Sequence, residues 1–199
     1  MVDALLGKRE LVLFSSSPRR KELMEGAGFK LRVEEYPFNE SYPQDCSIDK
    51  VALYLAEQKA AQLPLEKSAD RIIITADTIV AMGDRILGKP AHRDEAIEML
   101  STLSGNSHRV LTGVCIKSGS RCRSFVSESK VKFADLSIGE IEYYVDNYKP
   151  FDKAGSYGIQ EWIGYIGVEY ISGSYFNVMG LPVQKLYSEL KEFLKELNS

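Results

Sequence analysis

The stretch LVLFSSSPRRKELM, residues 11–24, joins a short apolar run to a polar segment with the pattern of a helix start. The apolar run at residues 11–14 is typical of a strand. Pro18 suits the first position of a helix because its missing N–H would be unpaired there anyway, and Ser17 is a suitable capping residue before it. The stretch therefore predicts the end of a strand that turns directly into a helix.

The polar part of this stretch has the chemistry of an anion cradle. The hydroxyls of residues 15–17 and the guanidinium groups of Arg19 and Arg20 lie at the expected helix start, where backbone N–H groups point back at the turn. Charged donors of this kind bind phosphate groups. An ordinary capped helix with two solvated arginines explains the same residues, so both interpretations stay open.

The composition limits the class of ligand. The 199 residues are enough to bury a core, and they are most simply one domain over residues 1–199. A net charge of −3 and a pI near 5.6 argue against a protein that binds nucleic-acid polymers or membrane surfaces. Any positive site must therefore be local, and a small anionic ligand fits it better than a polymer.

The cysteines and histidines indicate a reduced, cytoplasmic protein without a zinc site. Cys46, Cys115 and Cys122 are odd in number and lack the spacing of metal ligands, and no apolar run is long enough to span a bilayer. The two histidines, His92 and His108, do not make a histidine-rich site. We expect each histidine to be a surface residue or a hydrogen-bonded structural residue.

A carboxylate interrupts the apolar run RIIITADTIVAM at residues 71–82. Such a run is typical of a strand covered on both faces, and Asp77 lies in its middle. An unpaired buried carboxylate is costly, so Asp77 needs a cation, a metal or a water-filled cleft beside it. A structural ion pair would satisfy it, but we favour a catalytic or metal-binding role because perturbed carboxylates concentrate at functional sites.

Two lysines are candidates for phosphate binding. Lys59 falls within the apolar face of the helix expected after Ser47, so it either extends along that face to solvent or leans into a cleft. The segment from Gly83 to Lys89 has the spacing of a phosphate-binding P-loop, but Pro90 removes the magnesium-binding hydroxyl and excludes a following helix. We therefore reject that motif, and Lys89 is either a single phosphate-binding charge or an exposed turn lysine.

Further patterns predict the remaining elements. They are a hairpin turn at 82–85, a helix at 94–103, two strands at 108–117 and 121–133, a helix that begins with a capping box at 137–140, a strand at 166–171, a glycine-punctuated turn at 173–181 and a closing helix from Pro182. In the helix after the capping box, we expect Ile138, Ile141, Val145 and Tyr148 to face inward.

Residues 152–160, DKAGSYGIQ, are neither helical nor alternating. They contain a charged pair, two glycines, an aromatic residue and an amide. Glycines let the backbone approach a ligand, so the segment is either a ligand-facing loop or a plain connection.

Six motifs, in order, resemble those of the Maf nucleotide pyrophosphatases, and the resemblance runs from about Leu11 to Pro182. The motifs are SSSPRR at 15–20, ADT at 76–78, GKP at 88–90, LSG at 103–105, DKAGSYGIQ at 152–160 and GSYFNVMGLP at 173–182. The resemblance implies a mixed α/β fold, with an elongated twisted mixed sheet flanked by helices and two lobes around a central cleft. It also implies hydrolysis of nucleoside triphosphates to monophosphate and pyrophosphate with a divalent metal, Mg²⁺ or Mn²⁺, and a homodimer.

The resemblance also assigns site residues. The family's phosphate-binding residues map to Ser15, Arg19, Arg20, Lys59 and Lys89. Its catalytic carboxylate maps to Asp77, and its second acidic position falls on Glu40, so that both acids are expected metal ligands. The chain departs from the family pattern beside Glu40, because Asn39 stands where an aspartate often precedes that glutamate.

Members of the family that act on dTTP and UTP resemble this chain in having Arg19, Thr78 and Gln160, whereas members that act on 7-methyl-GTP tend to carry tryptophan, glutamine and glutamate there. A uracil or thymine ring offers carbonyl acceptors and one N–H, which an amide and a guanidinium can match.

We expect Asp77 to orient or deprotonate the attacking water, to hold the metal, or both. Two alternatives remain: a nucleotide-sensing regulator of division that does not hydrolyse, and an enzyme of the same type that acts on modified pyrimidine triphosphates.

Overall fold

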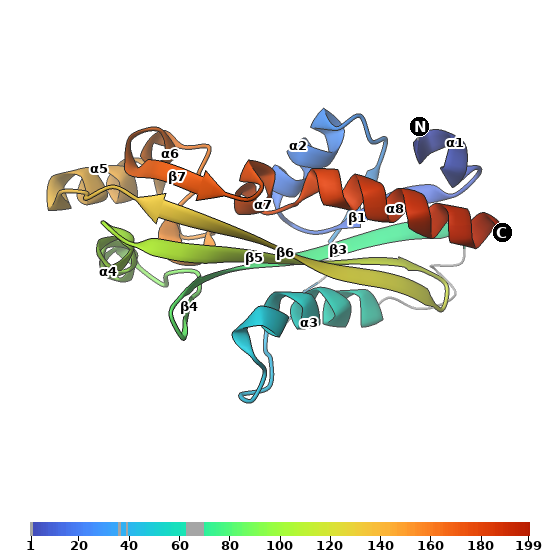
Figure 1. Ribbon diagram of the computed structural model, residues 1–199, viewed down its shortest axis with the longest axis horizontal. Helices are drawn as coiled ribbons and strands as arrows, with labels where there is room; N and C mark the ends of the chain where they lie inside the picture. The colour runs from blue at the N-terminus through green and yellow to red at the C-terminus, as the bar shows by residue number, and fades with distance from the viewer. Residues whose placement is uncertain (1, 36, 39, 63–69) are drawn as a thin grey trace. The chain divides into compact units, whose positions relative to one another are not determined.

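The computed structural model describes residues 2–35, 37–38, 40–62 and 70–199. Within these residues a seven-stranded mixed sheet has the strand order β2-β1-β3-β5-β6-β7, and β4 pairs with β3 (Figure 1). The strands are β1 (Glu10–Phe14), β2 (Arg32–Glu34), β3 (Arg71–Met82), β4 (Arg85–Leu87), β5 (Ser107–Ser118), β6 (Arg121–Phe133) and β7 (Val168–Ser172). The helices are α1 (Val2–Leu6), α2 (Pro18–Gly26), α3 (Ile48–Ala61), α4 (Arg93–Leu103), α5 (Ile138–Tyr148), α6 (Trp162–Gly167), α7 (Tyr175–Met179) and α8 (Val183–Asn198), with a 3₁₀ turn η2 (Ala154–Ser156).

This arrangement confirms the mixed α/β class, with a mixed sheet flanked by helices. The chain groups into two compact units. Unit 1 comprises the described residues of 1–77 together with 112–127 and 180–199, and unit 2 comprises residues 78–111 and 128–179. The single domain over residues 1–199, the elongated shape and the central cleft stay predictions.

In unit 1, the strand-to-helix transition expected from residues 11–24 is confirmed. β1 ends at Phe14 and α2 begins at Pro18. β1 is parallel to β2 and to β3, and Val12 lies opposite Arg32 on one side and Ile73 on the other. Parallel neighbours need a crossover connection, and α2 supplies the one between β1 and β2.

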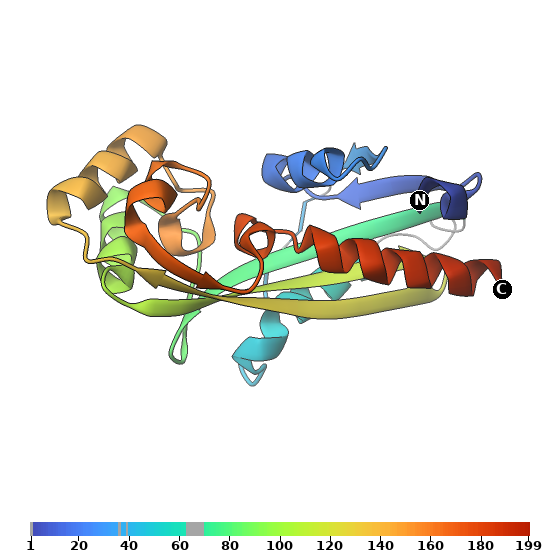
Figure 2. The ribbon, with the colours of Figure 1, turned by 45° about the horizontal axis from the view of Figure 1, so that its top comes forward.

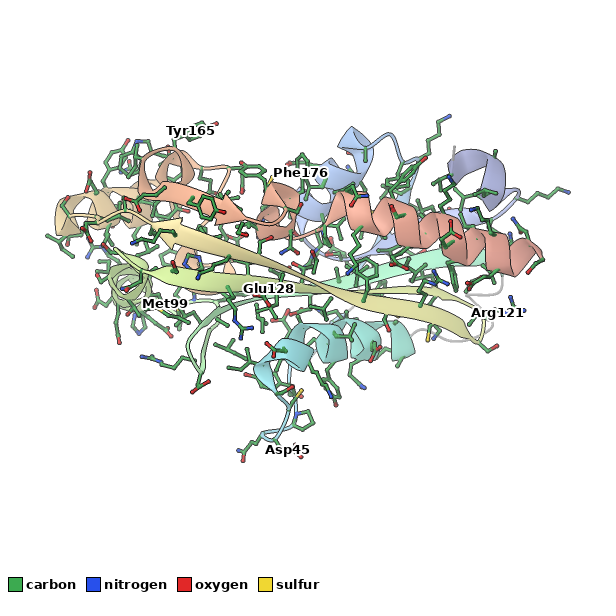
Figure 3. All side chains as sticks on the ribbon, in the orientation of Figure 1. Asp45, Met99, Arg121, Glu128, Tyr165 and Phe176 are labelled. Carbon is green, nitrogen blue, oxygen red and sulfur yellow. The ribbon has the colours of Figure 1, made fainter. Side chains whose placement is uncertain are left out.

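Helices cover both faces of the sheet within unit 1. On β6, Ser124 contacts Glu57 of α3, whereas the preceding Arg123 pairs with Glu189 and Glu196 of α8. Since successive side chains of a strand point to opposite faces, α3 and α8 lie on opposite faces of the sheet, as two views show (Figures 1 and 2). At the tip of the β5–β6 hairpin, Arg121 donates a 2.8 Å hydrogen bond to the Glu196 carbonyl (Figure 3).

In unit 2, the expected hairpin and capping box are both confirmed. β3 and β4 pair in antiparallel orientation with Val80 opposite Leu87, and Gly83 and Asp84 form the turn. Ser137 and Glu140 make reciprocal bonds at the start of α5. A helix, α7, occupies part of residues 173–181, where only a turn was expected. Five residues make a single short turn of helix, too few to show a helical period in the sequence.

The expected inward face of α5 is partly wrong. Ile141 and Val145 are buried, but Ile138 is 60% exposed and Tyr148 is 37% exposed. These two residues lie in the first and last turns of the helix. Tyr144 is instead fully buried, in the same cluster as Ile141 and Val145.

A buried histidine lies in the core of unit 2. His108 is 2% exposed, its Nε2 lies 2.7 Å from the Tyr157 hydroxyl, and its Nδ1 has no hydrogen-bond partner among the described residues. Burial lowers the pKa of His108 from 6.5 to about 4. The other histidine, His92, is exposed and caps α4. Both histidines are therefore structural, as expected.

We predict that acidification destabilises the protein through His108. Between about pH 6.5 and 4 the unfolded chain binds a proton that the native His108 does not, so stability falls as the pH falls through this window. Near pH 5 the loss reaches about 2 kcal/mol relative to neutral pH. Urea unfolding of wild type and His108→Gln at both pH values measures it, with His92→Gln as the matched control. Equal losses in wild type and His108→Gln would contradict this assignment.

Candidate active site

Asp77 and Lys59 form a close ion pair in unit 1. Lys59 Nζ lies 2.5 Å from Asp77 Oδ1 and 3.5 Å from Glu40 Oε1. The side chains of Lys59 and Asp77 are 12% and 9% exposed, whereas that of Glu40 is 44% exposed. We expected a cation, a metal or a water-filled cleft beside Asp77, and the structure places a cation there, Lys59. This one lysine bridges the two predicted metal ligands.

Local geometry explains why this lysine reaches this carboxylate. Thr75 and Asp77 are two residues apart on β3 and share a face of the strand. Ala56 and Lys59 are three residues apart on α3 and share a face of the helix. The Thr75 hydroxyl donates a 2.6 Å hydrogen bond to the Ala56 carbonyl, which seats α3 on β3 and places Lys59 beside Asp77. Of the two interpretations of Lys59, the one in which it points away to solvent is wrong.

The SSSPRR turn is organised around Ser15. The Ser15 hydroxyl accepts hydrogen bonds from the Ser17 N–H at 3.2 Å and from Arg20 Nη1 at 3.3 Å, so its own hydrogen can donate to an anion. Ser17 occupies the capping position of α2, but its side chain makes no capping hydrogen bond, in contrast to the expectation. The hydrogen bond that Ser17 makes here is the one from its backbone N–H to the Ser15 hydroxyl.

The second contact of Arg20 could not be predicted from the sequence. Arg20 Nε donates a 2.9 Å hydrogen bond to the backbone carbonyl of Gly180, which has a φ of +120°. Such a φ favours glycine at position 180. Through the carbonyl of this glycine, the GSYFNVMGLP motif contributes a backbone acceptor that orients the Arg20 guanidinium. A backbone carbonyl has no side-chain signature, and only the motif itself marked the segment.

The charges of this cluster act on one another. Burial lowers the pKa of Arg20, the carboxylates of Asp77 and Glu40 raise it, and Arg19 lowers it. Since the guanidinium keeps its proton, unit 1 places cations of α2 and α3 around two carboxylates. An approaching phosphate would meet donors of the helix start, the Ser15 hydroxyl and Lys59.

Unit 2 contains the other predicted residues, Thr78, Lys89 and Gln160. Thr78 is partly buried on β3, and Lys89 is exposed after β4. Gln160 is partly buried, and its amide oxygen is fully buried without a hydrogen-bond partner among the described residues. A buried acceptor without a donor is costly, so the Gln160 amide oxygen is an unsatisfied polar group in this part of the structure.

The DKAGSYGIQ segment is a tightly packed loop. The Gly155 N–H donates a 3.0 Å hydrogen bond to the Gly88 carbonyl, which ties the loop to the residue before Lys89. A Cβ on Gly155 would lie 3.0 Å from the Val80 side chain. The Ser156 hydroxyl contacts the sulfur of Met99, on α4, at 3.1 Å (Figure 3). The loop is therefore packed against its neighbours, which a plain surface connection would not need.

Three further residues form a polar network that sequence reasoning missed. Tyr144, on α5, hydrogen-bonds through its hydroxyl to the Glu161 carboxylate and to the Gly158 N–H. Lys153 pairs with the same carboxylate at 3.1 Å. The only signal in the sequence was the charged pair at 152–153, whose lysine belongs to this network.

Asp77 and Glu40 are a chemically suitable pair for a divalent cation. Mg²⁺ commonly takes one or two carboxylates and completes its octahedral shell with water and substrate phosphates. Among the described residues, no group of three or more His, Cys, Asp or Glu side chains could hold a metal by itself. The donor set therefore fits a cation that arrives with a phosphate chain. Asn39 lies outside the described residues.

Sequence comparisons with known proteins point to one family. A family model described as Maf-like protein matches residues 10–193. A dTTP/UTP pyrophosphatase of Phocaeicola vulgatus is 53% identical over 188 residues, covering 94% of this chain and 97% of the relative. One from Porphyromonas gingivalis is 50% identical over 191 residues, covering 94% and 96%. Among solved structures, a crystal structure of a nucleoside-triphosphatase / dITP/XTP pyrophosphatase from Mycobacterium abscessus matches with a TM-score of 0.41 and 13% sequence identity. The match covers 96% of this chain and 98% of the other chain.

Among the described residues, no helix has the length and the apolar character to cross a membrane.

Proposed function

Because the chain belongs to the Maf family, we propose that it hydrolyses nucleoside triphosphates, dTTP and UTP above all, to the monophosphate and pyrophosphate. The resemblance inferred from the six motifs is confirmed by the family match over residues 10–193. The observation that carries the proposal in the structure is the buried Asp77, paired with Lys59 at 2.5 Å in a cluster that includes Glu40 and Arg20. Together with this activity, we predict that the protein is cytoplasmic and forms a homodimer.

The chemistry follows from the charges of the cluster. Hydrolysis requires a water to attack the α-phosphorus while the bond to the bridging oxygen of pyrophosphate breaks. Asp77 is placed to accept a proton from that water or to orient it. Ser15, Arg19, Arg20, Lys59 and Lys89 would bind the phosphate oxygens and stabilise the charge that develops on them.

A divalent cation fits this scheme. Asp77 and Glu40 would hold Mg²⁺ or Mn²⁺, which supplies electrostatic stabilisation of the phosphate oxygens when bound. Lys59 lies between the two carboxylates, and its positive charge offsets part of theirs. A bound phosphate chain would give Lys59 a third anion to contact, so the lysine would serve both the carboxylates and the substrate.

Base recognition would depend on Arg19, Thr78 and Gln160. The buried oxygen of Gln160, which has no hydrogen-bond partner among the described residues, is an acceptor, and the N3–H of a uracil or thymine ring is a donor. Cytosine has no hydrogen on N3 and would leave the amide oxygen unpaired. This match supports a preference for UTP and dTTP, and it would extend to modified pyrimidines that keep the N3–H.

The proposal is tested with purified protein and a panel of nucleoside triphosphates. Pyrophosphate is measured directly and the monophosphate by chromatography. We expect equal amounts of both products, with UTP and dTTP turned over fastest in the presence of Mg²⁺ or Mn²⁺. Release of orthophosphate would mean that another bond is cut. Tight nucleotide binding without any turnover would instead favour the non-hydrolysing sensor, which has no need for Asp77.

Replacing Gln160 by leucine should remove the preference for the pyrimidine N–H. A site built to hydrogen-bond a ligand group loses about 1–3 kcal/mol when that bond is lost, so kcat/KM for UTP should fall about 5- to 150-fold. The control is Gln184→Leu, which removes an exposed glutamine of α8. An unchanged kcat/KM for UTP in Gln160→Leu would exclude this role for the amide.

A further inference from the structure

One buried hydroxyl connects both ends of the turn that carries Gln160. Tyr144 is 0% exposed, its hydroxyl donates to Glu161 Oε2, and it accepts a 3.0 Å hydrogen bond from the Gly158 N–H. The Glu161 N–H closes the turn through a 2.9 Å hydrogen bond to the Gly158 carbonyl. Gln160 lies inside this turn, and the residues at both ends of the turn bond to the same hydroxyl.

The carboxylate at the end of this turn is neutralised. Lys153 Nζ lies 3.1 Å from Glu161 Oε1 and 2.7 Å from Asp152 Oδ1, and the Lys153 side chain is 9% exposed. Each oxygen of Glu161 therefore has one donor, Lys153 on Oε1 and Tyr144 on Oε2. Buried polar networks that are fully satisfied in this way hold a single geometry.

Steric constraints leave the network little room to rearrange. A Cβ on Gly158 would lie 2.8 Å from the Glu161 carboxyl carbon, and a Cβ on Gly164 would lie 1.8 Å from the Ile159 carbonyl oxygen. Burial and the Glu161 carboxylate raise the pKa of the Tyr144 hydroxyl, so it keeps its proton and remains a donor at neutral pH. The backbone on each side of Gln160 is therefore held by contacts that tolerate no added atom.

We propose that Tyr144, Lys153 and Glu161 are positioning residues for base specificity, which hold the turn 158–161 so that the buried amide oxygen of Gln160 meets the N3–H of a uracil or thymine ring. This inference rests on the proposed function. In this proposal, each of the three residues acts through Gln160. A hydrogen bond to a buried acceptor discriminates between bases only if the acceptor cannot move to a second partner.

The test compares UTP with N3-methyl-UTP, which has the same triphosphate but no N3–H. In wild type, kcat/KM for UTP should exceed that for N3-methyl-UTP at least tenfold. Tyr144→Phe keeps the ring and removes the hydroxyl, so this ratio should fall at least fivefold. The loss should come from a higher KM for UTP, while kcat/KM for N3-methyl-UTP changes less than twofold. A purely structural defect would lower both values together.

Two further variants complete the design. Tyr148→Phe is the matched control, because Tyr148 stacks on Tyr144 with ring centroids 5.1 Å apart and is 37% exposed. It should keep the wild-type ratio. Glu161→Gln keeps an acceptor for Tyr144, so its ratio of kcat/KM for UTP to kcat/KM for N3-methyl-UTP should stay closer to the wild-type value than that of Glu161→Leu. If Tyr144→Phe does not fold, as judged by its thermal transition, the two Glu161 variants provide the test: a lower ratio in Glu161→Leu than in Glu161→Gln supports the inference, and wild-type ratios in both overturn it.

The outcomes separate this inference from the proposed function. A folded Tyr144→Phe with the wild-type ratio overturns the inference, and so does a wild type that hydrolyses UTP and N3-methyl-UTP equally well. Both results leave the release of pyrophosphate intact. Absence of pyrophosphate release by wild type from every nucleotide would overturn the proposed function itself.

Discussion

Replacing Asp77 by asparagine should lower kcat for pyrophosphate release from UTP at least by the roughly 10²–10⁴-fold that is typical of a lost general base. The substitution keeps the size of the side chain and removes its negative charge. Asparagine cannot take up the proton of the attacking water, and it is a weak ligand for a divalent cation. Steady-state kinetics with direct detection of pyrophosphate measures the effect.

The same variant separates the catalytic interpretation of Asp77 from the structural one. A purely structural ion pair with Lys59 would show itself as a lower melting temperature with near-normal turnover of the folded protein. We expect the reverse: a folded protein that binds nucleotide and turns over very slowly. The control is Asp84→Asn, in the exposed β3–β4 turn, which should keep wild-type turnover. Near-normal kcat in Asp77→Asn would exclude the assignment.

Replacing Gly113 by alanine should cause a large loss of stability. A Cβ at this position of β5 would lie 2.3 Å from backbone atoms of Ala52 and Leu53, in α3. Backbone atoms cannot move aside as the end of a flexible side chain can, so α3 must shift away from the sheet. We expect a loss of about 3 kcal/mol in the free energy of unfolding, at the upper end of the usual range for overpacking. The melting temperature should fall on the order of 10 °C.

This substitution should also lower activity, because α3 carries Lys59. A shift of the helix lengthens the 2.5 Å contact between Lys59 and Asp77. Calorimetry and steady-state kinetics on the same preparation measure both effects. The control is Gly139→Ala, in α5, where a Cβ meets nothing within 4 Å and helix propensity favours alanine by up to about 1 kcal/mol. Equal melting temperatures for Gly113→Ala and wild type would contradict the close contact between α3 and β5.

Some parts of the site could be predicted because their signal is local. Asp77 stands out because it interrupts a run of residues that are otherwise apolar, and a buried charge must have a partner. Lys59 stands out on a helical wheel for the same reason. Neither argument identifies the partner, and the structure shows that each of the two residues is the partner of the other.

Other parts gave no signal because the contacts join segments that are distant in sequence. Arg20 is held by the carbonyl of Gly180, 160 residues further along the chain. Tyr144 looked like an ordinary residue of α5, and Tyr148 was expected to face inward in its place. The helix period alone does not say how far the neighbouring core extends along a helix, so the exposure of Ile138 and Tyr148 was decided by packing.

From the sequence alone came the strand-to-helix turn at residues 11–24, the buried strand with its single carboxylate, the capping box of α5 and the family. These follow from periodicity, from backbone chemistry and from ordered motifs, all of which act within a few residues of the chain. Tertiary structure alone decided that Lys59 neutralises Asp77, that Gly180 orients Arg20 and that Tyr144 holds the turn around Gln160. Those contacts depend on which distant segments pack together, and packing is set by the whole core at once.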